Sequence, residues 1–347
     1  MKNILFRVDA GKEIGLGHYK RCLAISNQLN GTAKSLFLTK TEEIINLNKE
    51  SQTIKIKTDY DIKQQITLTE NIIKKFNVDV VLCDINNKMS SDQPGDYTYY
   101  LDKISKMNIL LVSFEDFKIY DVSSDIIIIP YIGANKIPIN KRKNTTYLLG
   151  PKYFIIRDEF MMYRKKNPCN EVRNILIGMG GSDSNNLTKI IIQSILGILQ
   201  NIHLNIIKGP LNKFNYDYIK RMLNKSKISF EIHESPEDIS RLMGISDLGI
   251  ISSGLTQYEA SVIGLPTIVI SLNDYHKQVV DEYAKMDSII SFGILNSSKT
   301  EILEKTISNL INDQYLRKRM SINGKNILDG KGIERLISNI KNKLESR

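Results

Sequence analysis

The chain has 347 residues and three cysteines, which is enough length for two domains that bury their own cores without disulfide or metal staples. It is 41% hydrophobic and 25% charged, as globular proteins are, and no apolar run is long enough to cross a bilayer. The net charge is +10, but the basic residues are spread along the whole chain without a basic arm or an Arg-rich helix, which argues against nucleic-acid binding.

The first apolar stretch predicts a strand at residues 3–8 and is interrupted by Arg7 and Asp9, so it lacks the uncharged core of a signal peptide. The cysteines Cys22, Cys83 and Cys169 are far apart in sequence, so a disulfide framework is not expected. We therefore expect a cytoplasmic monomer with no stable membrane insertion and no nucleic-acid partner.

Short apolar runs alternate with amphipathic segments along the first half, a pattern that predicts β-α units around a parallel sheet. After the first strand we expect a loop to Gly17 and a helix at 18–29, with Cys22, Ile25 and Leu29 on the face toward the sheet. Further strands are predicted at 36–38, 78–83, 109–114 and 126–130. These elements predict one α/β domain over residues 1–160.

A second series of β-α units follows residue 172. Its strands are predicted at 174–178, 204–208, 229–232, 248–252 and 267–271. A helix is expected at 187–199, and Ser235 followed by Pro236 predicts the start of another. With 150–174 as the connection, we predict an α/β fold of two Rossmann-like domains facing a cleft, over residues 1–160 and 161–347.

Loops at the carboxyl ends of parallel strands are where open α/β sheets bind ligands. The loop after the first strand contains Gly15 and Gly17, which let a ligand approach the backbone, and it places His18 at the start of the next helix. A helix N-terminus offers unpaired N–H groups and a positive potential that favour an anion. His18 is suited to act there as a general base on water; the alternative is that it caps the helix or packs beside Cys22.

A second glycine loop lies between a predicted strand and a predicted helix. Gly180, Gly181, Ser182 and Asn186 suit a phosphate or sugar hydroxyls at the helix start. The alternative is a tight turn capped by Asp183 or Asn186.

A third loop also favours nucleotide binding. Ser253, Gly254, Leu255 and Thr256 lead into a helix whose first N–H groups suit a diphosphate. Glu259 lies about one turn later, where its carboxylate could accept both hydroxyls of a ribose. The alternative is a solvated Glu259 on an ordinary surface helix.

Three acidic residues at the ends of predicted strands are candidates to face the cleft: Asp84, Glu115 and Asp116. The alternative is that these carboxylates cap a neighbouring element or are solvated. The remaining histidines show no metal-ligand spacing with Cys, Asp or Glu, so no metal site is predicted: His203, His233 and His276.

Four segments together carry a family resemblance: Phe6–Asp9 with 14–21, 149–153 with 157–160, 179–183, and 253–259 with 264–266. In these segments the chain resembles the nucleotide-sugar hydrolases of pseudaminic acid biosynthesis and their spore-coat polysaccharide relatives, which have a GT-B fold. The resemblance covers nearly the whole chain. Its first segment is the most specific, whereas the last two are shared widely with GT-B glycosyltransferases.

The resemblance implies hydrolysis of a UDP-linked diacetamido-trideoxy-hexose to UDP and the free sugar, with no metal and no cofactor. It implies that His18 activates the water, and that the second domain holds UDP through Gly180–Gly181, Ser253–Gly254 and Glu259. The partner is then a small-molecule UDP-sugar. Its remaining contacts are expected from Arg7, Asp9, Gly15, Gly17, Arg21, Asp84 and Asp116.

The chain departs from the family pattern where the sugar is expected. The family's Asp-x-Tyr is Asp84-Ile85-Asn86 here, its paired aspartates are Glu115-Asp116, and its Asn-Gln is Asn273-Asp274. These departures keep open a GT-B glycosyltransferase that uses a nucleotide-sugar donor, for which an exposed apolar patch ringed by lysines would argue. A non-catalytic nucleotide-sugar sensor is a third possibility, favoured if the His18 side chain is buried against the sheet.

Overall fold

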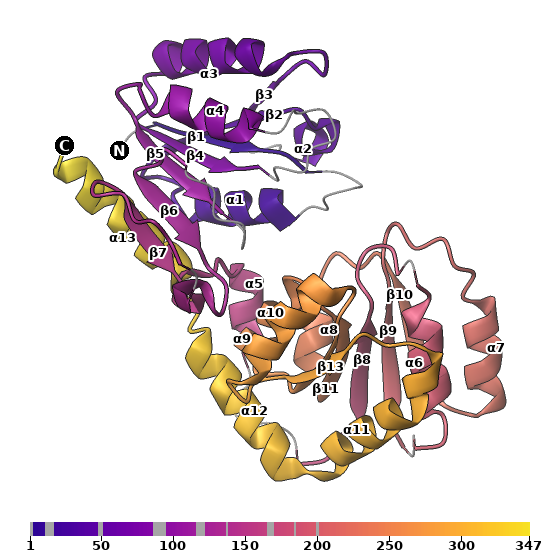
Figure 1. The fold of residues 1–347 in the computed structure, drawn as a ribbon. Coiled ribbons are helices and arrows are strands. Elements are labelled where there is room, and N and C mark those ends of the chain that lie inside the picture. Colours follow the sequence, from indigo (N-terminus) through magenta and orange to yellow (C-terminus); the bar gives the residue numbers. More distant parts are fainter. Residues whose placement is uncertain are drawn as a thin grey trace. The chain divides into compact units, whose positions relative to one another are not determined.

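The computed structural model describes residues 3–10, 17–47, 51–85, 95–115, 122–136, 138–164, 170–183, 185–198 and 201–347. Within these ranges the chain forms two compact units, each built on a parallel β-sheet (Figure 1). Unit 1 comprises Met1–Arg157 and Gly330–Arg347, and unit 2 comprises Asp158–Asp329. The predicted fold class, two α/β domains with parallel sheets, is confirmed.

The sheet of unit 1 has seven strands in the order β3-β2-β1-β4-β5-β6-β7, and every neighbouring pair is parallel. The strands are β1 (Asn3–Val8), β2 (Lys34–Thr39), β3 (Gln52–Lys55), β4 (Val80–Asp84), β5 (Leu110–Phe114), β6 (Ile126–Ile129) and β7 (Thr146–Leu149). The strand order reverses between β1 and β4, so the loops after these two strands open at the topological switch point of the sheet, where ligands bind in open α/β folds.

Helices cover both faces of this sheet (Figure 1). They are α1 (Gly17–Gln28), α2 (Glu42–Leu47), α3 (Ile62–Phe76), α4 (Asp96–Ile104) and α13 (Gly332–Glu345), with the short 3₁₀ turns η1 (Ala134–Lys136) and η2 (Pro151–Tyr153). On α1 the predicted stripe is confirmed, because Cys22, Ile25 and Leu29 are buried in the core formed with the central strands. The helical spacing of these apolar residues therefore predicted α1 correctly.

The final helix, α13, belongs to unit 1 although it ends the chain (Figure 1). Ile333, Leu336 and Ile340 are buried in the same core as α1, and Arg335 Nη1 donates a hydrogen bond to the Lys152 carbonyl at 2.8 Å. This arrangement differs from the expected boundaries, which grouped residues 330–347 with the second domain. The apolar face of a helix shows that it covers a core, but it does not show which of two cores it covers.

The sheet of unit 2 has six parallel strands in the order β10-β9-β8-β11-β12-β13. The strands are β8 (Asn174–Gly178), β9 (His203–Lys208), β10 (Ser229–Glu234), β11 (Leu248–Ser252), β12 (Thr267–Ile270) and β13 (Ile290–Gly293). The helices are α5 (Asp158–Met162), α6 (Leu187–Ile195), α7 (Asp217–Lys225), α8 (Ile239–Ile245), α9 (Thr256–Ile263), α10 (Asp274–Ala284), η3 (Ser297–Lys299), α11 (Thr300–Asn312) and α12 (Gln314–Ile327). The switch point of this sheet lies between β8 and β11.

One predicted helix start in unit 2 is wrong. Ser235 does not cap α8: its φ is +48°, and its backbone N–H donates to the Lys208 carbonyl at 2.8 Å. The cap is Asp238, whose carboxylate accepts the Arg241 N–H at 2.8 Å. Both Ser and Asp are good N-cap residues, so composition alone does not select between them.

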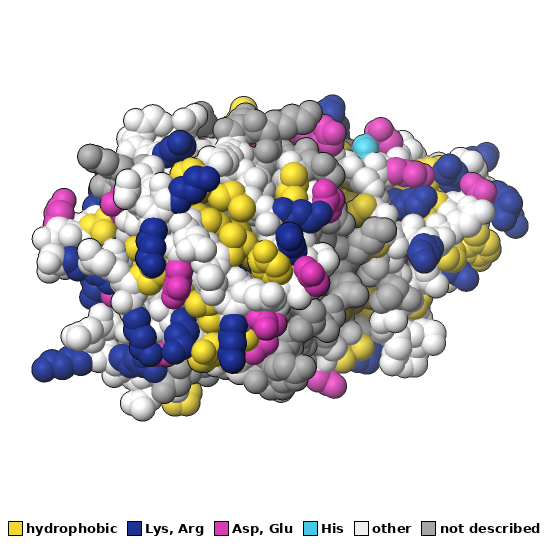
Figure 2. All heavy atoms as spheres, turned by 90° about the horizontal axis from the view of Figure 1, so that it is seen from above, with side chains coloured by type: hydrophobic (Ala, Val, Ile, Leu, Met, Phe, Trp, Pro, Cys, Tyr) yellow, Lys and Arg dark blue, Asp and Glu magenta, His cyan; other side chains and the backbone are white. Residues whose placement is uncertain are grey.

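On the face drawn in Figure 2, Lys and Arg side chains are interspersed with acidic, polar and apolar ones and do not gather into a single patch. None of the helices in the described ranges combines the length and the apolar composition that a membrane crossing requires.

Candidate functional site

The sequence-predicted residues form two groups, one at the switch point of each sheet. His18 follows the loop after β1 and Asp84 ends β4, so unit 1 brings together residues that are 66 positions apart in sequence. In unit 2, the Gly180–Gly181 loop follows β8 and the Ser253–Gly254 loop follows β11. Each group is described on its own below.

His18 is held by Asp84. Its Nδ1 lies 2.7 Å from Asp84 Oδ1, and the side chains are 16% and 1% exposed, respectively. Because His18 keeps an exposed part, it is not buried against the sheet. Its other ring nitrogen, Nε2, has no hydrogen-bond partner in the part of the chain that the structure describes. The imidazole is therefore oriented from one side and accessible from the other.

Arg21 completes the cluster from the next turn of α1. Its Nε and Nη2 donate to the two carboxylate oxygens of Asp84 at 2.7 and 2.6 Å, a bidentate pair. The guanidinium also stacks on Phe114, with 4.2 Å from Cζ to the ring centroid. Burial by itself would raise the pKa of Asp84, but the charges and hydrogen bonds of Arg21 and His18 outweigh it and hold that pKa well below its usual value. Asp84 is thus an ionised acceptor.

The ionised carboxylate decides the tautomer of His18. An anionic oxygen only accepts hydrogen bonds, so a nitrogen 2.7 Å from it must carry the proton. Arg21 Nη2 also lies 3.2 Å from Nδ1, but two donors do not bond to each other, and we assign Nδ1–H to Asp84. The lone pair is then on Nε2. Sequence reasoning predicted that Asp84 contacts the sugar; in the structure both of its oxygens bond to His18 and Arg21.

The other two predicted contacts from the β1 region are buried. Arg7 and Asp9 are 1% and 0% exposed, and their Nη1 and Oδ2 lie 2.6 Å apart. Asp9 Oδ1 accepts the Thr39 hydroxyl at 3.1 Å and the Lys40 N–H at 2.6 Å. Asp9 therefore ties the carboxyl ends of β1 and β2 together, and Arg7 balances its charge.

Glu115 is a buried carboxylate at the end of β5, 4% exposed, and accepts a hydrogen bond from the Tyr97 hydroxyl at 2.7 Å. Burial and the charge of Glu115 raise the pKa of Tyr97 well above its usual value, so the phenol stays a donor. Gly17 is the first residue of α1. Four residues named from sequence lie outside the described residues: Gly15, Asn86, Asp116 and Cys169.

In unit 2, the β8 glycine loop is shaped by close backbone packing. A Cβ on Gly209 would lie 2.3 and 2.4 Å from the carbonyl oxygens of Gly180 and Gly181, so only glycine fits there. Leu211 N–H donates to the Gly181 carbonyl at 2.9 Å. A Cβ on Gly180 would lie 3.2 Å from Ser252 Oγ, which shows that the loops after β8 and β11 meet.

The helix after this loop is already capped. Asp183, 6% exposed, accepts the N–H groups of Leu187 and Thr188 at 2.7 and 3.1 Å. Asn186 occupies the N-cap position with φ +51° but gives no side-chain cap to the described residues. The alternative of a capped turn therefore holds for the start of α6 through Asp183, and a ligand role here stays a prediction for the exposed residues Gly180, Gly181, Ser182 and Asn186.

The start of α9 is more open. Leu255 occupies its N-cap position and makes no side-chain cap bond with a described residue, so N–H groups of the first turn, which includes Thr256, lack such a cap. Gly254 has φ +141°, and no described atom lies within 4 Å of the Cβ that another residue would add. Glu259 is half-buried in the first turn. These features suit an anion approaching the backbone of Gly254.

Sequence reasoning missed one residue of this group, His276. Its Nδ1 lies 2.8 Å from the Ser253 hydroxyl, and Ser253 Oγ also accepts the Leu272 N–H at 3.3 Å. His276 was considered only as a metal ligand. The available signal was that it lies in the first turn of the helix after β12, the strand next to β11.

No group of three or more His, Cys, Asp or Glu side chains in the described ranges is placed to hold a metal ion. Cys22 and Cys83 are both buried and free of disulfides. Burial raises the pKa of the Cys83 thiol to about 12 and that of Cys22 well above its usual value, so neither is a nucleophile at neutral pH.

Two known proteins are similar to the chain in sequence. It is 30% identical over 297 residues to the Uncharacterized protein MJ1062 of Methanocaldococcus jannaschii, covering 80% of this chain and 57% of that protein. It is 25% identical over 336 residues to the Spore coat polysaccharide biosynthesis protein SpsG of Bacillus subtilis, covering 94% of each. The chain thus spans little more than half of the first relative and nearly all of the second. No model of a known protein family matches it.

Solved structures show the same fold along the whole chain. MurG of Acinetobacter baumannii has a TM-score of 0.71 at 15% identity, covering 99% of this chain and 100% of that one. The UDP-GlcNAc 2-epimerase of Neisseria meningitidis bound to UDP-GlcNAc has a TM-score of 0.64 at 15% identity, covering 99% and 100%. At these identities the likeness establishes the fold, which is GT-B.

Proposed function

We propose that the protein is a metal-independent hydrolase of a UDP-linked amino sugar, of the diacetamido-trideoxy-hexose class, that releases UDP and the free sugar. The observation that carries the proposal is the His18–Asp84–Arg21 cluster at the switch point of unit 1, with 2.7 Å between His18 Nδ1 and Asp84 Oδ1. The name of SpsG and the UDP-GlcNAc bound to a protein of the same fold support a nucleotide-sugar substrate.

The chemistry follows from the tautomer. His18 Nε2 takes a proton from water, and the oxygen of that water attacks the anomeric carbon of the sugar. The bond from this carbon to the diphosphate oxygen breaks, and UDP leaves with the electron pair. Asp84 holds the ring and stabilises the imidazolium that forms, while Arg21 keeps Asp84 ionised.

The two tasks lie on different units. His18 belongs to unit 1, whereas the Gly180–Gly181 and Ser253–Gly254 loops and Glu259 belong to unit 2. Donors at the start of α9 would stabilise the charge that develops on the departing diphosphate. Mutation can therefore separate proton transfer from nucleotide binding.

The first test is UDP release from a panel of UDP-amino sugars, with and without EDTA and with no acceptor present. We expect release without acceptor or metal, and its loss in His18→Gln, which keeps the side-chain bulk but not the base. Asn27→Ala, an exposed position on the same helix, serves as the control. UDP binding should survive in both variants.

Other outcomes identify the other activities. Release that begins only when an acceptor sugar is added would make the protein a glycosyltransferase. UDP binding without release under either condition would make it a nucleotide-sugar sensor. Among the described residues of unit 1, the one large apolar side chain classed as exposed is Tyr99, which is not the apolar patch that would argue for a transferase.

The role of Glu259 has its own test. If its carboxylate accepts the ribose hydroxyls, the wild type binds UDP more tightly than 2′-deoxy-UDP, and Glu259→Ala removes that preference with roughly a tenfold loss for UDP. Glu237→Ala, an exposed position in the same unit, is the control. A preference that persists in Glu259→Ala would rule out the ribose contact.

A further inference from the structure

The fold does not need the side-chain contact between Ser253 and His276 to hold either residue in place. Ser253 is already tied to the sheet by its backbone, since its N–H donates to the Ile270 carbonyl at 2.8 Å. The first turn of α10 is already capped, since Asn273 Oδ1 accepts the His276 N–H at 2.8 Å. The side-chain pair therefore adds a link between two elements that are each fixed without it.

Ser253 and His276 lie beside the uncapped start of α9. Ser253 is 7% exposed and directly precedes Gly254, where no atom of the described residues lies within 4 Å of an added Cβ. The His276 ring is half-buried, and the Tyr275 ring lies 5.9 Å away at 51°. A nearly buried hydroxyl at the mouth of an uncapped helix is thus held in a defined position by a histidine.

The hydrogen-bond inventory of Ser253 predicts what it recognises. A serine oxygen accepts at most two hydrogen bonds and donates one. Leu272 N–H supplies one bond at 3.3 Å. Ser253 Oγ and His276 Nδ1 are 2.8 Å apart, and we assign the ring proton to Nδ1, which makes His276 the donor of the second bond. Both lone pairs are then occupied, so the hydroxyl hydrogen is left to donate. A group that only accepts hydrogen bonds, such as a phosphate oxygen, matches this site.

We propose that His276 is a positioning residue for a diphosphate group: by donating to Ser253, it makes the serine hydroxyl a donor aimed at a phosphate oxygen. If the proposed function is right, the ligand is a nucleoside diphosphate. The nucleoside part of this assignment rests on the proposed function, whereas the diphosphate part does not. His276 itself acts through Ser253 and is not assigned a contact with the reacting atoms.

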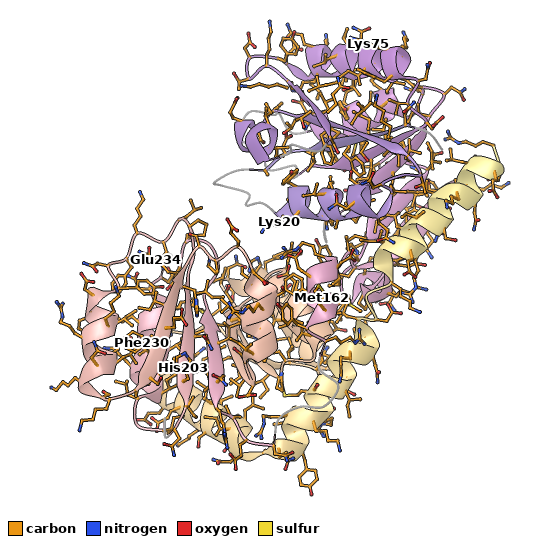
Figure 3. All side chains as sticks on the ribbon, turned by 180° about the vertical axis from the view of Figure 1, so that it is seen from behind. Lys20, Lys75, Met162, His203, Phe230 and Glu234 are labelled. Carbon is orange, nitrogen blue, oxygen red and sulfur yellow. The ribbon has the colours of Figure 1, made fainter. Side chains whose placement is uncertain are left out.

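The chain supplies a matched control. His203 Nδ1 lies 2.7 Å from the Ser229 hydroxyl, at the amino-terminal ends of β9 and β10. Figure 3 shows His203 at the end of this sheet opposite to Glu234, the last residue of β10. The control pair therefore has the same chemistry but lies at the amino-terminal end of the strands, where open α/β folds do not bind ligands.

The experiment compares the binding of UDP and uridine by calorimetry. His276→Ala and Ser253→Ala are each expected to weaken UDP binding roughly tenfold and to leave uridine binding unchanged, because the lost bond goes to a charged phosphate. The double variant should be no weaker than either single one, since both remove the same relay. His203→Ala should match the wild type.

Rescue distinguishes positioning from folding. The amide of His276→Asn takes the place of Nδ1 and should restore most of the UDP affinity, whereas His276→Gln places its amide farther out and should not. Equal UDP affinity in the wild type and His276→Ala, or equal losses for uridine and UDP, would overturn the proposal while leaving the hydrolase intact.

Failure of the proposed function is recognised separately. If the wild type does not bind UDP, the nucleotide assignment fails, and inorganic pyrophosphate becomes the probe. Pyrophosphate binding that is weakened in His276→Ala but not in His203→Ala would support the diphosphate site without the nucleoside. Absence of pyrophosphate binding in the wild type would overturn this inference as well.

Discussion

At the scale of single residues, Asp84 decides how His18 is presented. It is 1% exposed, and both its oxygens are engaged by His18 and Arg21. The sequence predicted each of these three residues as part of the site, with His18 as the base and Arg21 and Asp84 as substrate contacts, but it did not predict the bonds among them. Their mutual bonds depend on the β1–β4 pairing, which joins residues more than 60 positions apart, and side-chain partners at that separation are not readable from one sequence.

The electrostatics of Asp84 predict a pH-dependent stability. Asp84→Asn leaves the buried guanidinium of Arg21 without its charge partner, which should cost about 3–5 kcal/mol in the free energy of unfolding at pH 7. The native pKa of Asp84 lies below that of an unfolded chain, so this stabilisation is present above about pH 4 and is lost as the pH falls through the lower native value.

Urea unfolding of the wild type and Asp84→Asn between pH 7 and pH 3 measures this effect. The gap between the two proteins should narrow in acid. Asp102→Asn, which removes the exposed pair with Lys106, is the control and should unfold with a midpoint close to the wild type. A gap that stays constant down to pH 3 would show that the native pKa of Asp84 is not lowered relative to the unfolded chain.

At the scale of elements, buried strands were the best predicted part of the fold. β1, β8 and β11 have the predicted bounds, because central parallel strands are continuous apolar runs. The strands β3, β7 and β13 were not predicted, and all three lie at sheet edges with four residues each. An edge strand is short and half-exposed, so its hydrophobic signal is weak.

The close packing of the glycine loop after β8 predicts the effect of a substitution at Gly209. A Cβ on Gly209 would press on the carbonyl oxygens of Gly180 and Gly181, so Gly209→Ala must displace the loop. We expect about 1–3 kcal/mol of destabilisation and weaker UDP binding. Thermal unfolding and UDP titration measure the two effects.

Gly197 is the matched control for this substitution. It is an exposed glycine of the same unit, and no described atom lies within 4 Å of its added Cβ. Gly197→Ala should therefore keep both the stability and the UDP affinity of the wild type. If Gly209→Ala behaves in the same way, the close packing of these two loops does not hold in solution.

At the scale of the whole molecule, the last helix predicts where stability is lost. Leu336 of α13 is 1% exposed in the core of unit 1. Leu336→Ala should cost about 2–5 kcal/mol, and the loss should raise hydrogen exchange in the β-sheet of unit 1. Exchange in unit 2 should be unchanged.

Lys341→Ala, at an exposed position of the same helix, controls for a general effect of substitution in α13. Faster exchange in unit 2 instead of unit 1 would restore the domain boundary that the sequence suggested, with residues 330–347 in the second domain.

The return of α13 to unit 1 also sets an order for folding during synthesis. Unit 2 is a continuous segment, Asp158–Asp329, whereas the core of unit 1 lacks Ile333, Leu336 and Ile340 until α13 has left the ribosome. Domains generally fold from the N-terminal one onward as the chain emerges. In this protein unit 2 is therefore the first that can complete its core, and the sheet of unit 1 must wait for its last covering helix until α13 has been translated.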